Sequence, residues 1–142
     1  MPESAPPSAA DLLAMIPYAA TLGIALDEVT PQRTRGRLRW SPGLCTTGGV
    51  MNGGAIISLA DNIGALCAFL NLPAGANTAT VDSATNFFRG VREGTLHATA
   101  RPLHVGRSFI VVRTELTDDC GRPVGQTTQT QAVLQGSPPG RP

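Results

Sequence analysis

The sequence contains little charge of either sign, and this scarcity argues against two large classes of partner. Charged residues make up 15% of the 142 residues, and 11 basic side chains against 10 acidic ones leave a formal net charge of +1. A chain so close to neutral is not expected to bind nucleic acid or an acidic membrane surface through general electrostatics. Hydrophobic residues reach 42%, so we expect a large share of the surface to lie in contacts between subunits.

Cysteine and histidine are also scarce. The three cysteines, Cys45, Cys67 and Cys120, are odd in number and widely spaced, and the two histidines, His97 and His104, lie apart from them. This spacing predicts neither a disulfide framework nor a metal site, and it favours a reducing, cytoplasmic setting. Residues 1–17 lack the basic segment and the long apolar run of a signal peptide, so no export signal is expected.

Local patterns predict a short helix, a strand, a long helix and then four further strands. Ser8 is a suitable N-cap for a helix that ends near Pro17, and the long helix covers residues 53–70. Alternating or β-branched runs predict strands at about 31–40, 78–89, 94–105, 108–118 and 123–134. We expect residues 1–142 to form one domain whose Pro/Gly/Ser-rich ends, about 1–8 and 135–142, are frayed.

The long helix is apolar on nearly every side, although it contains Asp61 and Asn62. Its length approaches that of a membrane span, but these polar residues favour a buried helix of a soluble protein. Consecutive antiparallel strands beside such a helix predict an α+β fold in which a sheet curls around the helix. Because one curled sheet covers only part of a helix, we expect a second subunit to cover the remainder.

Four arginines precede the long helix at alternate positions: Arg33, Arg35, Arg37 and Arg39. A period of two is typical of a strand, so the four side chains are expected on one face of a sheet. They could bind phosphate groups, but we favour a solvated face paired with acidic residues of a neighbouring strand.

The start of the long helix has the chemistry of an oxyanion site. Asn52 is a good N-cap, and Gly53 and Gly54 leave the first backbone N–H groups sterically open at the positive end of the helix dipole. Asp61 lies about 12 Å further along the same axis, too far to act on the same small centre within one subunit. Across a two-fold dimer, the glycines of one helix can face the aspartate of the other. If Asp61 is instead structural, its partner is expected to be Ser58 or Thr80.

Three segments together resemble a known family: "GGVMNGGAIISLADNIGALCAFL", "TATVDSATNFFRGVREGTLHATARPLHVGRS" and "TDDCGRPVGQTTQTQAVL". They are similar to hotdog-fold acyl-CoA thioesterases of the PaaI type, which include phenylacetyl-CoA and 4-hydroxybenzoyl-CoA thioesterases. The likeness covers about residues 20–134. It implies an antiparallel sheet wrapped around the long helix, an acyl-CoA substrate, no cofactor, and assembly as a homodimer or homotetramer.

The resemblance also implies roles for individual residues. A backbone N–H of the Gly53–Gly54 pair would hold the thioester carbonyl, and Asp61 would act as nucleophile or as general base for water. Asn52 stands where the family usually has a histidine, so this position can donate a hydrogen bond but cannot titrate. Thr46 stands where relatives often have glutamine or asparagine.

The coenzyme A end would contact Arg89, Arg107 and Ser108, since a guanidinium binds phosphate through paired hydrogen bonds. Thr80 would face the acyl pocket, whereas Phe69, Phe87 and Phe88 are expected in the core. Two alternatives stay open: a non-catalytic acyl-CoA-binding module, favoured by Asn52, and a hotdog hydratase or dehydratase. The second is disfavoured because residues 40–75 contain no histidine.

Overall fold

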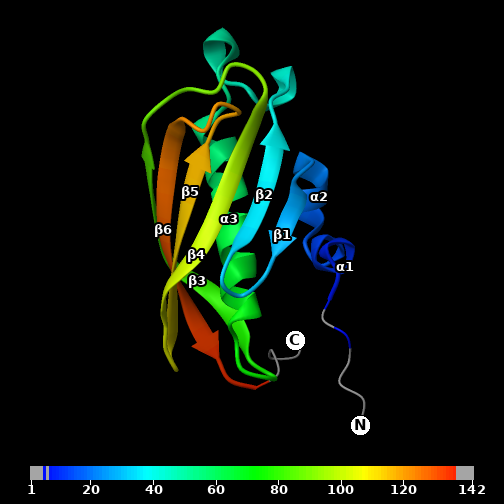
Figure 1. Ribbon diagram of the computed structural model, residues 1–142, viewed down its shortest axis with the longest axis vertical. Helices are drawn as coiled ribbons and strands as arrows, with labels where there is room; N and C mark the ends of the chain where they lie inside the picture. Colours follow the sequence, from blue (N-terminus) through cyan, green and yellow to red (C-terminus); the bar gives the residue numbers. More distant parts are fainter. Residues whose placement is uncertain (1–4, 6, 137–142) are drawn as a thin grey trace, which may run out of the picture.

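A single antiparallel sheet curls around one long helix in the computed structural model, which describes residue 5 and residues 7–136 (Figure 1). The strand order is β1-β2-β4-β5-β6-β3. The helices are α1 (Ala9–Ala14), α2 (Pro17–Leu22) and α3 (Gly53–Leu70). The strands are β1 (Ala25–Val29), β2 (Thr34–Arg39), β3 (Asn77–Phe87), β4 (Thr95–Val105), β5 (Phe109–Thr117) and β6 (Pro123–Leu134).

The predicted α+β architecture is confirmed, and most of the predicted elements are present. The long helix and the four strands that follow it begin and end within about two residues of the predicted positions. Four short elements were not predicted: α2, β1 and two 3-10 helices, Pro42–Leu44 and Thr47–Gly49. Pro17, expected to end the first helix, is the first residue of α2, where its missing N–H is tolerated. Much of the predicted fraying at 1–8 and 135–142 lies outside the described residues.

Side chains from α3 and the inner face of the sheet form the core. Leu59, Ile63 and Cys67 on α3 are fully buried, and they pack in one cluster with Leu96 and Val112 of the sheet. By length and composition alone α3 could cross a membrane, with a mean hydropathy of 1.6, but half of it is already buried inside the fold. The core helix of a soluble protein passes the same test.

The arginine stripe of β2 lies on the outer face of the sheet, as predicted. Arg35, Arg37 and Arg39 are exposed and alternate with buried residues. Arg37 is paired with Asp27 of β1, and Arg33 donates to Glu28 at 2.7 Å. The expected pairing with acids of a neighbouring strand is therefore present for two of the four arginines.

Candidate active site

The N-terminus of α3 presents one free backbone donor. The Oδ1 atom of Asn52 accepts the N–H of Gly54 at 2.7 Å, and the Asn52 carbonyl accepts those of Ala55 and Ile56. The N–H of Gly53 has no acceptor within the described part of the chain. Since the helix dipole is positive at this end, this N–H is suited to an oxygen that gains negative charge. The amide nitrogen of Asn52 is likewise without a described acceptor, and its side chain is exposed.

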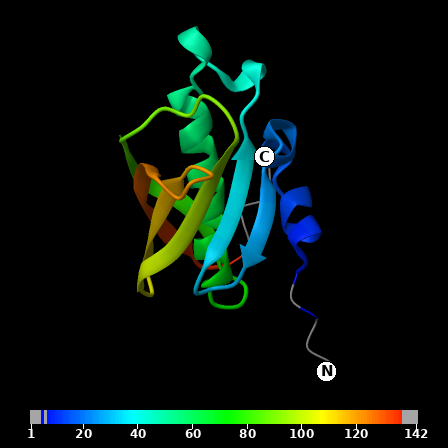
Figure 2. The same ribbon diagram turned by 45° about the horizontal axis from the view of Figure 1, so that its top comes forward.

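The loop of residues 41–51 holds this helix start in place at the top of the molecule (Figure 2). The N–H of Asn52 donates to the Leu44 carbonyl at 2.8 Å, and the backbones of Cys45 and Met51 pair in an isolated antiparallel β-bridge. Thr46 lies in this loop, exposed, with its N–H bonded to the Val50 carbonyl at 2.8 Å.

Two side chains that the sequence analysis did not single out fasten the same loop. The indole N–H of Trp40 donates to the Gly49 carbonyl at 3.1 Å, and Arg92 donates to the Gly48 carbonyl at 3.0 Å. Gly48 and Gly49 both have positive φ, 76° and 73°, a conformation that glycine adopts readily. In the sequence, the consecutive glycines Gly48 and Gly49 were the feature that could have indicated a loop with positive φ angles.

Asp61 lies about two turns along α3 and is half-buried. Burial raises the pKa of its carboxyl above the ordinary value. Neither expected structural partner contacts it through a hydrogen bond: Ser58 bonds to Tyr18 and to the Gly54 carbonyl, and Thr80 accepts from Gln131. Within the described residues the Asp61 carboxylate has no hydrogen-bond donor, so the structural alternative, in which Ser58 or Thr80 is its partner, has no support. A half-buried carboxylate without a partner is suited to take up a proton or to attack an electrophile.

The turn of α3 that carries Asp61 rests on a polar side chain of the sheet. Gln129 of β6 is fully buried, and its amide nitrogen lies 3.5 Å from the Asp61 carbonyl oxygen. Gly64 makes this approach possible, because a Cβ there would overlap the Gln129 amide and lie 3.1 Å from the Thr114 hydroxyl. The Gln129 amide oxygen and the Thr114 hydroxyl are buried without a described partner. Sequence reasoning missed Gln129; a glycine inside an apolar helix was the signal for a close approach.

One side of α3 is not covered by the rest of residues 5 and 7–136. Ile57 is 39% exposed, and Asp61, Ala65 and Phe69, which follow at one-turn spacing, are only partly buried. This open face contains Asp61 and otherwise mainly apolar side chains. Gly53 and Asp61 share one straight helix, so a single chain does not bring them together.

The residues expected at the coenzyme A end are also far apart within one chain. Arg89 follows β3 near the start of α3, whereas Arg107 and Ser108 form the turn between β4 and β5 at the other end of the sheet (Figure 1). Both arginines are exposed. The expectation that Phe87 and Phe88 lie in the core was wrong, since they are 49% and 58% exposed. Thr80, expected at the acyl pocket, lies on β3 with its hydroxyl bonded to Gln131 at 2.7 Å.

No metal centre is evident in residues 5 and 7–136: they contain no group of three or more His, Cys, Asp or Glu side chains placed to hold an ion. All three cysteines are free thiols, Cys67 buried and Cys120 exposed.

A family match, related sequences and a similar solved structure all associate this chain with esterases and thioesterases. The family described as Thioesterase superfamily matches residues 48–124. A Mycobacterium tuberculosis protein named "Putative esterase Rv1847" is 31% identical over 139 residues, which cover 96% of this chain and 99% of that protein. The 1,4-dihydroxy-2-naphthoyl-CoA hydrolase of Escherichia coli is 30% identical over 86 residues, or 61% of this chain and 63% of the hydrolase. The crystal structure of thioesterase HI1161 from Haemophilus influenzae matches with a TM-score of 0.88, over 99% of this chain and 100% of that one; at 22% identity this is a likeness of fold.

Proposed function

Because the chain belongs to the Thioesterase superfamily and is a thioester hydrolase with the hotdog fold, we propose that it hydrolyses acyl-CoA to a free acid and coenzyme A. The observation that carries this proposal is the pairing of features on α3: a free N–H at Gly53 and an unpartnered carboxylate at Asp61 on the uncovered face. The two alternatives, a non-catalytic acyl-CoA-binding module and a hotdog hydratase or dehydratase, have no support from the family. We propose that the enzyme acts in the cytoplasm, in keeping with its free thiols.

The chemistry needs no group beyond those on α3 and water. The Asp61 carboxylate takes a proton from water, and the water oxygen attacks the thioester carbonyl carbon. The carbonyl oxygen becomes an oxyanion, which accepts the Gly53 N–H. As the tetrahedral intermediate collapses, the C–S bond breaks, and the departing thiolate receives the proton from Asp61. In the nucleophilic variant, the carboxylate attacks the thioester carbonyl carbon, the C–S bond breaks and coenzyme A leaves as the thiolate. Water then hydrolyses the resulting Asp61–acyl anhydride, which releases the free acid, restores the carboxylate and supplies the proton that the thiolate takes up.

Gly53 and Asp61 would come from different subunits of a two-fold dimer. The separation of about 12 Å along one helix prevents joint action within a chain. The open face of α3 supports a dimer, as does β3, an 11-residue edge strand whose second edge has no strand partner among the described residues. Long unpaired edges usually associate or are protected, so pairing of β3 with a second β3 would continue the sheet.

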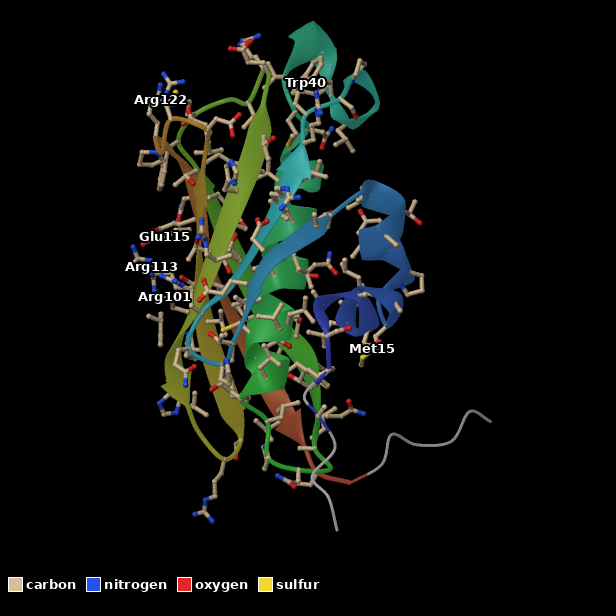
Figure 3. The ribbon with its side chains drawn as sticks, turned by 45° about the vertical axis from the view of Figure 1, so that its right-hand side comes forward. Met15, Trp40, Arg101, Arg113, Glu115 and Arg122 are labelled. Carbon is tan, nitrogen blue, oxygen red and sulfur yellow. The ribbon has the colours of Figure 1, made fainter. Side chains whose placement is uncertain are left out.

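A homotetramer would require a second contact, and we propose the outer face of the sheet. Arg101 and Arg113 lie opposite each other on β4 and β5, close to Glu115, on the side turned away from α3 (Figure 3). Like charges directly opposite are unfavourable in a sheet, and among the residues that the structure describes Glu115 pairs only with Arg113, at 3.2 Å. In a back-to-back pair, Glu115 of a second copy could also neutralise Arg101.

Asn52 would serve two purposes. Its Oδ1 atom already caps α3 through Gly54, while its amide nitrogen stays available to orient the thioester at the position where relatives have histidine. At a dimer interface, Arg89 of one subunit and Arg107 with Ser108 of the other would share the phosphates of coenzyme A. Thr46 and Gly54 would line the entrance around the helix start.

The experiment that tests this proposal measures thiol release from a panel of aryl and aliphatic acyl-CoAs, with light scattering on the same sample. We expect hydrolysis by a dimer or larger species, and a loss of about 10²- to 10⁴-fold in kcat for Asp61→Asn. The matched control is Glu115→Gln, which removes a carboxylate from the opposite face of the sheet and should retain activity. Absence of hydrolysis across the panel, an active monomer, or an active Asp61→Asn variant would each contradict the proposal.

A further inference from the structure

A buried amide lies under the turn of α3 that carries Asp61. Gln129 has no exposed surface and belongs to β6, which packs against α3 beside β5 (Figure 1). Its amide nitrogen lies 3.5 Å from the Asp61 carbonyl oxygen. Because a carbonyl oxygen only accepts, the nitrogen is the amide atom that suits this position. A helical carbonyl uses one lone pair for the N–H four residues later, so the second remains free for Gln129.

The helix lacks a side chain at the point where this amide approaches. A Cβ at Gly64 would overlap the Gln129 amide oxygen and lie 2.7 Å from its Cδ atom, closer than real Cβ atoms come to a neighbour. Any residue other than glycine would therefore displace the Gln129 amide. Glycine is less favourable than alanine inside a helix, so this close contact is made at the expense of helix stability.

Gln129 is poorly satisfied as a polar group. Its amide oxygen and the Thr114 hydroxyl, which both lie beside Gly64, are buried without a described hydrogen-bond partner. Burial of unpaired polar groups is unfavourable, and an apolar side chain of the same shape would not have this cost. Val112, opposite Gln129 on β5, is fully buried, so the position would accept an apolar side chain. Packing alone therefore does not account for a glutamine here.

We infer that Gln129 is a positioning residue, which fixes the turn of α3 around Asp61 and keeps the Asp61 carboxylate in its half-buried orientation. The inference rests on the proposed hydrolysis, in which Asp61 is the base or nucleophile, and adds a residue that does not touch the substrate. A reacting group that is displaced by about 1 Å can lose roughly 100-fold in rate, so an anchor under its backbone matters for catalysis.

The titration of Asp61 should report on this anchoring. Burial raises the pKa of its carboxyl, with no contribution from a charged neighbour among the described residues. The charged and histidine side chains of β2, β4 and β5 lie on the outer face of the sheet. Other titratable side chains on or beside α3 bond elsewhere or point away from Asp61: Asp11, Tyr18, Cys67 and Asp82. A turn released from Gln129 would give the Asp61 carboxyl more water, which would lower its pKa towards the ordinary value.

The first test replaces Gln129 by methionine, which is also unbranched and apolar. We expect kcat to fall about tenfold, the order of one lost hydrogen bond, with little change in KM because no substrate contact is removed. The melting temperature should stay the same or rise, since the unpaired buried amide is gone. Thr127→Val is the matched control: Thr127 is buried on the same face of β6, and its hydroxyl bonds to Thr85 of β3 at 2.7 Å, not to α3. It should lower the melting temperature and leave kcat unchanged.

A second test disturbs the same contact from the helix. Gly64→Ala displaces the Gln129 amide and should lower kcat by a similar factor. Added to Gln129→Ala, it should cause no further loss of kcat, because the atoms that it displaces are absent. Carbon-13 NMR titration of the Asp61 carboxyl needs no substrate, and it should give a lower pKa in Gln129→Met than in the wild type or Thr127→Val.

Failure of the proposed function and failure of this inference give different results. If the wild type hydrolyses no acyl-CoA but the pKa of Asp61 falls in Gln129→Met alone, the proposed function fails and the positioning role of Gln129 stands. If the wild type is active and Gln129→Met keeps its kcat and its Asp61 pKa, the proposed function stands and the inference is overturned. Equal losses of kcat in Gln129→Met and Thr127→Val would also overturn it, because any disturbance of β6 would then suffice.

Discussion

The two sides of α3 differ in what covers them. On one side Leu59, Ile63 and Cys67 have no exposed surface, because the curled sheet packs directly on them. On the other side Ile57 is 39% exposed, and the half-buried Asp61 lies among apolar neighbours. The residues on the covered side are fully buried by the same chain. The open side leaves apolar side chains in contact with water, which is typical of a surface that binds a partner.

The difference indicates that the two sides of α3 serve different purposes, packing against the sheet on one side and chemistry or association on the other. The covered side holds the sheet and the helix together and has no titratable group other than the buried Cys67 thiol. The open side has the only carboxylate of α3, and burial raises the pKa of that carboxyl. Stability should therefore respond most to the covered side, and catalysis and association to the open side.

The largest effect on folding should come from the covered side. Leu59→Ala should lower the free energy of unfolding by about 2–5 kcal/mol, since it removes a fully buried side chain and leaves a cavity. Ile57→Ala makes a similar truncation on the open side and should cost less, with its loss shrinking as the protein is diluted and the subunits separate, because the residue is then exposed in both proteins. Chemical denaturation at two protein concentrations measures both. Equal, concentration-independent losses would remove the distinction between the two sides.

The next effect concerns the start of α3. Asn52→Ser should preserve the melting temperature, because serine caps a helix about as well as asparagine, but should reduce kcat/KM roughly 10- to 1000-fold through loss of the free amide donor. Asn52→His should remain active, since histidine can also donate a hydrogen bond at this position. Unchanged turnover in Asn52→Ser would mean that Asn52 acts only as a helix cap and has no part in catalysis.

A smaller effect is expected at the two arginines that we propose to bind the phosphates of coenzyme A. Arg89→Glu and Arg107→Glu should each raise KM for acyl-CoA about tenfold, the order expected for one charge-assisted hydrogen bond. The same variants should act nearly normally on acyl-N-acetylcysteamine, which has no phosphates. Equal losses on both substrates would make these arginines structural. A defect in only one variant would argue against a shared site built from two subunits.

Much of the fold could be predicted because its elements follow strong local patterns. Alternating strands and one long apolar helix leave few architectures, and the turn glycines mark where the strands end. The short α2 and β1 were missed for a physical reason. A proline such as Pro17 is compatible with the end of one helix and equally with the start of the next. In β1, a bulge between Leu26 and Glu28 interrupts the alternation of buried and exposed residues that identifies a strand.

The candidate site was less predictable than the fold. The free N–H of Gly53 followed from helix geometry, and the proposed role of Asp61 rests on its setting together with a family resemblance. Long-range contacts were not accessible: nothing in local sequence indicates that Gln129, 68 positions later, approaches the Asp61 carbonyl, or that Tyr18 binds Ser58 at 2.9 Å. The open side of α3 was expected from composition, but which of its residues stay uncovered depends on the curl of the sheet.

The smallest effect is a stability difference that depends on pH. Burial raises the pKa of Asp61 in the folded chain, so between its ordinary value and the raised value the folded state binds more protons than the unfolded state. Wild-type stability therefore falls as pH rises through this window, and the full penalty remains above it. Asp61→Asn has no such penalty, so its melting temperature should equal or exceed that of the wild type at pH 7, by no more than a few degrees.

The gap between Asp61→Asn and the wild type should close as pH falls through the raised pKa, because both folded proteins then carry a neutral side chain at this position. Wild-type kcat/KM should fall over the same interval, since protonation removes the base or nucleophile. Melting curves from pH 4 to 8 beside a pH–rate profile would test this directly. A gap that stays constant with pH would mean that the Asp61 carboxylate is not destabilised by burial, and the open side of α3 would then differ from the covered side in packing alone.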